Sequence, residues 1–132
     1  MISGSGGLPT PPVGSTWGSM AYGNGRFLAI TTFVTSTTGA ILLDGSTTWT
    51  PVTLPSSANY WAFVGFGNGL FLMINSVGNV AYSTDGITWS ISTFALPGTG
   101  ISPSTTPVYG NGKFVIIGND GSFDYSFAAP FP

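Results

Sequence analysis

The sequence predicts an all-β protein built from three antiparallel sheet repeats of about 44 residues, the third of them truncated. The first observation is that the tripeptide Gly-Asn-Gly occurs three times, each time directly after an aromatic residue. These aromatic residues, Tyr22, Phe66 and Tyr109, are 44 and 43 residues apart, a period typical of repeat architectures. The second observation is that no helical periodicity of useful length occurs anywhere. The three copies of the tripeptide are Gly23-Asn24-Gly25, Gly67-Asn68-Gly69 and Gly110-Asn111-Gly112.

Each repeat is expected to contain a strand, a tight turn at Gly-Asn-Gly, a second strand, and two further strands joined by other turns. Asn-Gly between two apolar runs is the strongest short hairpin signal, because both residues tolerate a positive φ angle. Pro51 suits a strand at a sheet edge, where its missing backbone donor costs nothing. The third repeat has no counterpart of the fourth strand. The expected strands are 19–22, 26–33, 40–43 and 48–52, then 61–64, 70–75, 80–83 and 88–91, then 107–109, 113–117 and 123–126.

The chain divides into a short arm and one β-domain. Residues 1–15 are rich in Gly, Ser and Pro, which predicts a flexible arm or, equally, a strand-like arm that docks on a neighbouring subunit. The β-domain is 16–132, with repeats at 16–58, 59–100 and 101–132.

Charge is scarce in this sequence, and several residue types are absent. Two basic residues, Arg26 and Lys113, stand against four Asp, and the chain has no Glu, His or Cys. Two cations cannot form a phosphate-binding patch, so nucleic acid is not an expected partner. The missing Cys and His exclude thiolate nucleophiles, imidazole bases and the usual zinc sites. The net charge of −2 leaves little repulsion between monomers and therefore favours association.

The N-terminal residues lack the basic and apolar regions of a signal peptide, and the apolar stretches are too short to span a bilayer. We therefore expect a soluble protein with no membrane partner, released by lysis or assembly rather than by a secretion signal of its own.

Residues 83–89 carry a recognisable motif. They read Ser-Thr-Asp-Gly-Ile-Thr-Trp and resemble the Asp-box, or BNR repeat, of sialidase-type β-propellers, whose pattern is Ser-x-Asp-x-Gly-x-Thr-Trp. This copy is one residue shorter between Asp85 and Gly86. Together with the Gly-Asn-Gly turn before it, the string looks like the propeller-like repeats of phage virion and tail-associated proteins. Repeat 1 has a degraded copy at 42–49, with Leu42 in place of the Ser, and repeat 3 lacks the box.

The resemblance implies four-stranded, blade-like sheets, with the box on the outside of the propeller and away from any active site. From the residues themselves, we expect the carboxylates of Asp44 and Asp85 to accept hydrogen bonds from backbone N–H groups of their own loops. The Gly after each Asp is expected to take a positive φ angle, and the Trp that closes each box to bury a large area against a neighbouring strand or blade. These residues are Gly45, Gly86, Trp49 and Trp89. Contact with calcium or a glycan is the alternative role.

The sequence does not predict an enzyme. The resemblance implies that a sialidase would need three Arg and a Tyr–Glu pair, whereas this chain has one Arg and no Glu. A glycosidase with two carboxylates would most plausibly use Asp120 and Asp124, for which a loop-capping role is favoured. No catalytic residue, cofactor or metal is expected.

Fewer than three complete blades are present, whereas a closed propeller has four to eight. The chain is therefore a fragment, an open stack of sheets, or a subunit whose blades complete a shared structure. The N-terminal arm, or the arm of another subunit, could supply the missing strand of repeat 3 by β-augmentation. We therefore expect a partial or oligomer-completed β-propeller, present as a dimer or trimer.

Two functions follow as hypotheses. The first is a non-enzymatic structural protein of a phage particle (a capsid decoration, head fibre or tail-associated subunit), assembled in the host cytoplasm, exposed on the particle and joined to other virion proteins by the arm. The alternative is a carbohydrate-binding adhesin for host recognition. Its candidate glycan platform is Trp17, Asn59, Tyr60 and Trp61. Trp17 and Trp61 recur at the same repeat position, however, which favours core packing for these two residues.

Overall fold

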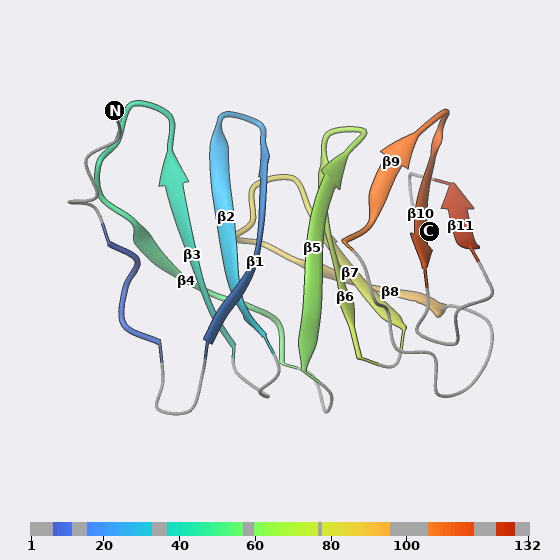
Figure 1. Ribbon diagram of the computed structural model, residues 1–132, viewed down its shortest axis with the longest axis horizontal. Coiled ribbons are helices and arrows are strands. Elements are labelled where there is room, and N and C mark those ends of the chain that lie inside the picture. Colours follow the sequence, from blue (N-terminus) through green and yellow to red (C-terminus); the bar gives the residue numbers. More distant parts are fainter. Residues whose placement is uncertain are drawn as a thin grey trace.

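The computed structural model describes residues 7–11, 16–32, 37–56, 60–76, 78–95, 106–117 and 124–128, with 93–95 and 124–128 described by their backbone alone. Within these residues the chain forms eleven strands and no helix (Figure 1). The all-β prediction is therefore confirmed, and the three sheets follow one another along the long axis of the molecule in chain order (Figure 1).

Each sheet is an antiparallel meander of strands that are consecutive in the sequence. The first sheet contains β1 (Thr16–Gly23), β2 (Arg26–Thr32), β3 (Thr38–Leu43) and β4 (Thr50–Thr53). The second contains β5 (Trp61–Gly67), β6 (Leu70–Asn75), β7 (Asn79–Ser83) and β8 (Ser90–Ala95). The third contains β9 (Val108–Gly110), β10 (Lys113–Ile117) and β11 (Asp124–Ala128), so the described residues include no fourth strand there.

The Gly-Asn-Gly tripeptides form the hairpin turns between the first two strands of each sheet. The three Asn have φ angles of 50–51°, and the Gly that follows each has a φ angle of 75–80°. Two successive residues with positive φ define a type I′ turn, whose twist matches that of the flanking strands. The sequence motif therefore fixes the register of β1 on β2, of β5 on β6 and of β9 on β10.

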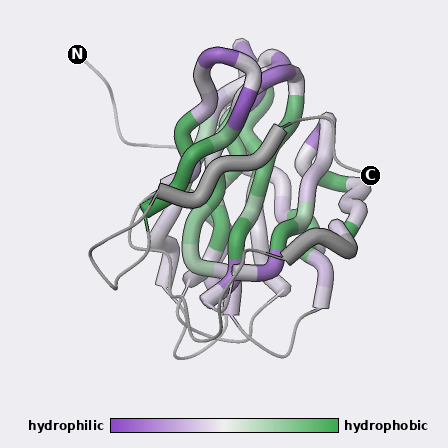
Figure 2. Tube along the Cα trace, turned by 90° about the vertical axis from the view of Figure 1, so that its right-hand side faces the viewer, coloured by the Kyte–Doolittle hydropathy of each residue, from purple (hydrophilic) through white to green (hydrophobic). Residues whose placement is uncertain are grey.

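The hydrophobic core lies between the sheets in two clusters. The first joins residues of the first sheet, such as Leu28 and Ile30, to residues of the second, such as Phe71 and Met73. The second cluster joins residues of β6 and β7 to the third sheet. Because successive side chains of β6 point to opposite faces, this strand contributes to both clusters. Figure 2 shows hydrophobic residues along the strands and hydrophilic residues at the hairpin turns.

The first strands of the first two sheets share an irregularity, and the position of Pro51 follows from its chemistry. A bulge lies between Trp17 and Ser19 in β1, and the same irregularity recurs between Trp61 and Phe63 in β5. Pro51 lies in β4, which is an edge strand as predicted.

The last strands of the first two sheets begin two residues later than expected, at Thr50 and Ser90. The two Trp that close the boxes therefore precede the strands.

The described part of the N-terminal arm lies on the first sheet. The indole Nε1 of Trp17 donates a hydrogen bond to the carbonyl oxygen of Pro9 at 3.2 Å, and Leu8 lies beside Trp17 and Ala29. Of the two alternatives for the missing strand of the third sheet, the arm of the same chain does not supply it with residues 7–11. Residues 1–6 and 12–15 lie outside the described residues.

Candidate functional site: the contacts between sheets

The loop at residues 83–89 is closed by its own side chains. The Ser83 hydroxyl donates to Asp85 Oδ1 at 3.0 Å and accepts from the backbone N–H of Gly86 at 2.8 Å. The same Asp85 oxygen accepts the backbone N–H groups of Ile87 at 2.8 Å and Thr88 at 2.9 Å. These bonds, first to Thr88 and then to Ile87, stabilise the charged carboxylate and hold the pKa of Asp85 below its usual value.

This loop also packs against the first sheet. Gly86 has a φ angle of 77°, and a Cβ placed on it would lie 3.1 Å from Cδ1 of Ile41 in β3. The Trp89 ring packs on the core cluster between the first two sheets, while its Nε1 donates to the Gly86 carbonyl oxygen at 3.0 Å. Gly86 and Trp89 of this loop therefore serve the contact between sheets.

The corresponding loop in repeat 1 differs from the prediction. The bond that the Asp44 carboxylate accepts comes from the Tyr22 hydroxyl at 2.8 Å, and this bond raises the pKa of Tyr22. It is the Ser46 hydroxyl that accepts a backbone N–H of the loop, from Thr48 at 3.1 Å. The expectation that Asp44 would bond its loop amides is therefore wrong. Leu42 stands where the Ser of the motif would be, and the loop is one residue longer than its copy in repeat 2. Gly45 has a φ angle of 79°, and Trp49 is half-buried.

Glycines of one sheet receive aromatic rings of the next. A Cβ on Gly23 would overlap with the Phe66 ring, and a Cβ on Gly67 would overlap with Tyr109. These glycines are needed for close approach of the strands rather than for their backbone angles. Gly110 occupies the same position in the third sheet, and no described atom lies within 4 Å of its Cβ position.

The ring that meets the glycine belongs to an aromatic pair that is formed three times. The ring centroids of Phe66 and Phe71 are 5.0 Å apart, and those of Tyr109 and Phe114 are also 5.0 Å apart. In the first sheet, Tyr22 and Phe27 form the same pair at 4.7 Å. The first sheet thus carries the ring pair that the other two sheets use to pack on a preceding sheet.

Polar side chains at the Gly-Asn-Gly turn of the first sheet join it to the second sheet. The Asn24 amide Nδ2 donates to the carbonyl oxygens of Gly69 at 3.0 Å and Thr84 at 2.8 Å. Arg26 Nη1 donates to the Asp85 carbonyl oxygen at 3.2 Å. Asn24 therefore does more than permit the turn.

The four residues of the candidate glycan platform do not form one surface. Trp61 is 2% exposed and packs in the core cluster between the first two sheets, with its Nε1 donating to the Pro55 carbonyl oxygen at 3.0 Å. A buried indole offers no ring face to a sugar, so Trp61 cannot serve as a platform. Trp17 is half-buried on the face of the first sheet that points away from the second sheet. Tyr60 is half-buried as well. Asn59 lies outside the described residues.

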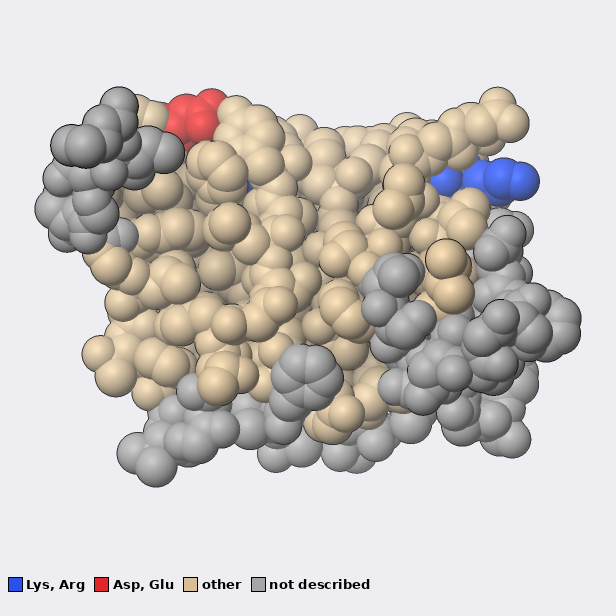
Figure 3. Space-filling view, in the orientation of Figure 1, with Lys and Arg blue, Asp and Glu red and all other residues tan. Residues whose placement is uncertain are grey.

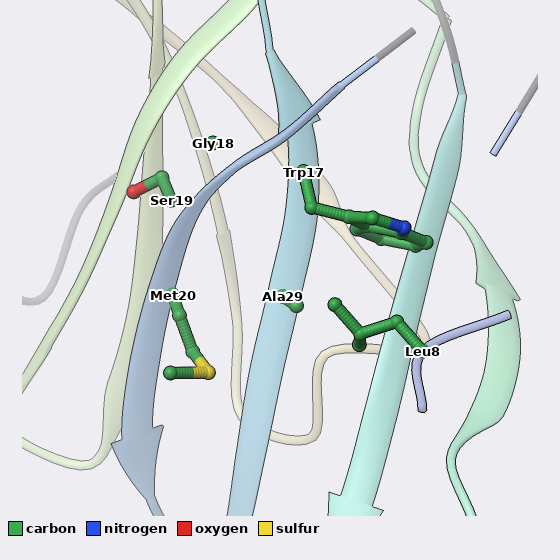
Figure 4. A pocket seen from close by; sticks show the side chains of 6 residues that line it. All are labelled: Leu8, Trp17, Gly18, Ser19, Met20 and Ala29. Atoms are coloured by element: carbon green, nitrogen blue, oxygen red, sulfur yellow. The ribbon is translucent and has the colours of Figure 1, made fainter. Parts of the chain in front are cut away.

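Trp17 instead lines an apolar pocket of about 270 Å³ on the first sheet (Figure 4). Trp17, Leu8 and Met20 project to the side of β1 and β2 that faces away from the second sheet, while Ser19 points the other way (Figure 4). The Ser19 hydroxyl accepts the backbone N–H of Val64 in the second sheet.

Sequence reasoning missed Leu8 and Pro9 as part of the repeat. The pair Leu54-Pro55 precedes Trp61, Pro55 accepts the indole N–H, and Leu54 is buried between the first two sheets. Leu8-Pro9 precedes Trp17 in the same way, and Pro9 accepts the indole N–H. The shared Leu-Pro dipeptide was the available signal.

The side chains of the two remaining candidate carboxylates lie outside the described part of the chain. Asp120 lies outside it, and Asp124 is described only as backbone in β11. Among the described residues there is no group of three or more His, Cys, Asp or Glu that could hold a metal ion. The same residues contain no helix long and apolar enough to cross a bilayer.

No protein-family model and no curated protein matches the chain. Among solved structures, the chain is similar to YCF48 bound to D1 peptide, a β-propeller protein, with a TM-score of 0.61 and 15% sequence identity. The fold is that of an open, partial β-propeller. The match covers 86% of this chain but only 36% of the YCF48 chain, so this chain spans about a third of that structure. At this identity the likeness concerns the fold alone.

Proposed function

We propose that the protein is a non-enzymatic structural subunit of a phage particle that acts as a homo-oligomer. The observation that carries the structural role is that the polar side chains around the turn and loop motifs of the first two sheets hold sheets and loops together. Asn24, Arg26 and Asp85 all bond to backbone groups within or between the first two sheets. The Trp61 indole is likewise buried in the core with its N–H bonded.

The virion part of the proposal rests on sequence resemblance. The string that runs from Gly-Asn-Gly to the box at 83–89 looks like the repeats of phage virion and tail-associated proteins. A surface with two basic and four acidic residues, solvated mainly by Ser, Thr, Asn and Gly, suits a subunit packed among others. The arm at 1–15 would then contact other virion proteins.

Immunoblotting of gradient-purified phage particles, with an antibody raised against the full chain, tests this proposal. A fixed copy number per particle, measured by quantitative mass spectrometry against capsid protein, is the expected result. Particles that are free of the chain, prepared from a lysate that contains it, would contradict the virion role.

A carbohydrate-binding adhesin is the second proposal, and it has to be centred on Trp17 because Trp61 is buried. Saturable binding of a defined sugar on a glycan array, lost in Trp17→Ala, would support it. No binding at millimolar sugar would count against it.

A further inference from the structure

The face of the first sheet that points away from the second sheet has the composition of an interior surface. We call it the front face, and its members are Met20, Tyr22, Phe27 and Ala29. Each has a counterpart 44 residues later, in the second sheet, that packs against the first sheet. These counterparts are Val64, Phe66, Phe71 and Met73.

The exposed fractions show that the front face lacks a sheet packed against it. Phe71 and Phe114, which have a preceding sheet to pack on, are 0% exposed. Phe27 occupies the same repeat position and is 36% exposed, while Met20 and Tyr22 are 55% and 49% exposed. Scattered apolar residues on a surface are ordinary, but a set whose counterparts in the second and third sheets are buried or half-buried indicates an interface.

The opposite end of the stack carries the complementary surface. We call it the back face, and its members are Val108, Gly110, Val115 and Ile117, on the side of the third sheet that points away from the second. The counterparts of Val115 and Ile117 in the first sheet are Leu28 and Ile30, which are buried against the second sheet. Gly110 has an open Cβ position, and Val108 is 66% exposed.

We propose that the front face of one copy of this chain docks on the back face of a second copy, with the Tyr22 ring seated on Gly110. This contact would repeat the two that already exist inside the chain, Phe66 on Gly23 and Tyr109 on Gly67. Two copies give six sheets, within the range of four to eight that closed propellers use, whereas three copies give nine. A head-to-tail contact that closes after two copies makes a discrete dimer rather than a fibre.

The pocket on the first sheet fits this docking (Figure 4). It is lined by Leu8, Trp17, Met20 and Ala29 among others, and has a volume of about 270 Å³. The counterparts of these residues, Leu54, Trp61, Val64 and Met73, lie in one buried cluster with Leu28 and Ile30 of the preceding sheet. Val115 and Ile117 of the second copy would therefore fill the pocket.

Charges at the two ends of the molecule are also complementary. Lys113 lies at the repeat position of Arg26, and Asp44 lies at the position of Asp85, whose carbonyl oxygen Arg26 bonds. Docking therefore brings Lys113 of one copy toward Asp44 of the other. Figure 3 shows basic atoms at the end of the third sheet and acidic atoms at the end of the first, on the same edge of the molecule.

This inference rests on the homo-oligomer of the proposed function, but it does not require a virion. Because the chain has no Cys, introduced cysteines can pair only with each other. Tyr22→Cys and Gly110→Cys would be purified separately, mixed, oxidised and separated on a non-reducing gel. Both positions are open in the single chain, so both variants are expected to fold.

The mixture is expected to give a disulfide-linked pair of chains, at least tenfold above either variant alone. The control replaces Tyr22→Cys with Asn79→Cys, which is exposed on β7 and belongs to neither face. The double variant Tyr22→Cys/Gly110→Cys is expected to stop at two linked chains. A ladder of longer products would overturn the closed dimer, and linkage no greater than in the Asn79→Cys control would overturn the docking.

Light scattering coupled to size exclusion gives a second measurement on the unmodified chain. The expected mass is twice the chain mass of 13.6 kDa, and Gly110→Leu is expected to weaken the dimer at least tenfold. A monomer at millimolar concentration would overturn the proposal. A dimer that is absent from phage particles would leave the docking intact and contradict only the virion role.

Discussion

The hydroxyl of Ser83 donates a hydrogen bond of 3.0 Å to the carboxylate of Asp85, two residues later in the same loop. With both side chains fixed, the loop presents Gly86 to the first sheet and the Asp85 carbonyl oxygen to Arg26. A local network thus positions a contact between two sheets.

The first prediction concerns acid stability. The folded state holds the pKa of Asp85 below its ordinary value of 3.8, so the ionised form is the one that the fold stabilises. This contribution is fully present above pH 3.8 and is lost as the pH falls through the lowered pKa. We therefore expect the free energy of unfolding, measured by urea denaturation, to fall as the pH is lowered below 3.8, and to fall less in Asp85→Asn.

Asp44→Asn is the matched control, since the Asp44 carboxylate accepts a hydroxyl rather than loop amides. Equal loss of acid stability in the wild type and in Asp85→Asn would contradict the role given to Asp85. At neutral pH, Asp85→Ala is expected to cost about 1–3 kcal/mol because two backbone donors lose a charged acceptor.

The second prediction compares three equivalent glycines. Gly23→Ala and Gly67→Ala place a methyl group inside an aromatic ring of the next sheet, and each is expected to cost about 1–3 kcal/mol. Gly110→Ala meets no described atom within 4 Å and is expected to leave the stability of the single chain within about 0.5 kcal/mol. Thermal unfolding at low protein concentration checks all three, and equal losses would contradict the packing described.

The third prediction separates the two roles of Asn24. Asn24→Gly keeps the positive φ angle but removes donors to Gly69 and Thr84 in the second sheet, at a cost of about 1–3 kcal/mol. Asn68→Gly makes the same change in a turn of the same geometry, with no side-chain bond to another described residue. It is expected to cost less than half as much. A larger loss in Asn68→Gly than in Asn24→Gly would argue against the inter-sheet role.

The fourth prediction compares one repeat position in two sheets. Phe71→Ala removes a ring that is 0% exposed and is expected to cost about 3–5 kcal/mol. Phe27→Ala removes the partly exposed counterpart and is expected to cost less in the dilute chain. If two copies dock, its cost should grow with protein concentration, which urea denaturation at micromolar and millimolar protein would measure. A cost that is independent of concentration would go against docking through Phe27.

Local signals in the sequence predicted the hairpins well. Asn24-Gly25 and its two copies carry their own backbone preference, so turn type and strand pairing follow from the residues themselves. The edge position of Pro51 follows in the same way from its missing donor. The strand order within each sheet is therefore readable from the sequence.

The roles of particular side chains depended on neighbours that the repeat alone does not specify. Trp17 and Trp61 occupy one repeat position, but only Trp61 has a preceding sheet within the chain to bury it. Asp44 and Asp85 differ because Leu42 replaces the Ser that helps to close the later loop. The repeat determines the position of a residue in its sheet, whereas its burial and hydrogen bonding depend on the neighbouring residues of the adjacent sheet or the same loop.

The meander order of the strands has a consequence for synthesis. Every strand of the first sheet precedes every strand of the second, and each pairs only with its neighbours in the sequence. The first sheet can therefore form before the second has left the ribosome. The surface at Gly23 is then already in place when the Phe66 ring packs on it. The chain grows from one end, and each completed sheet exposes a surface shaped for the sheet that follows.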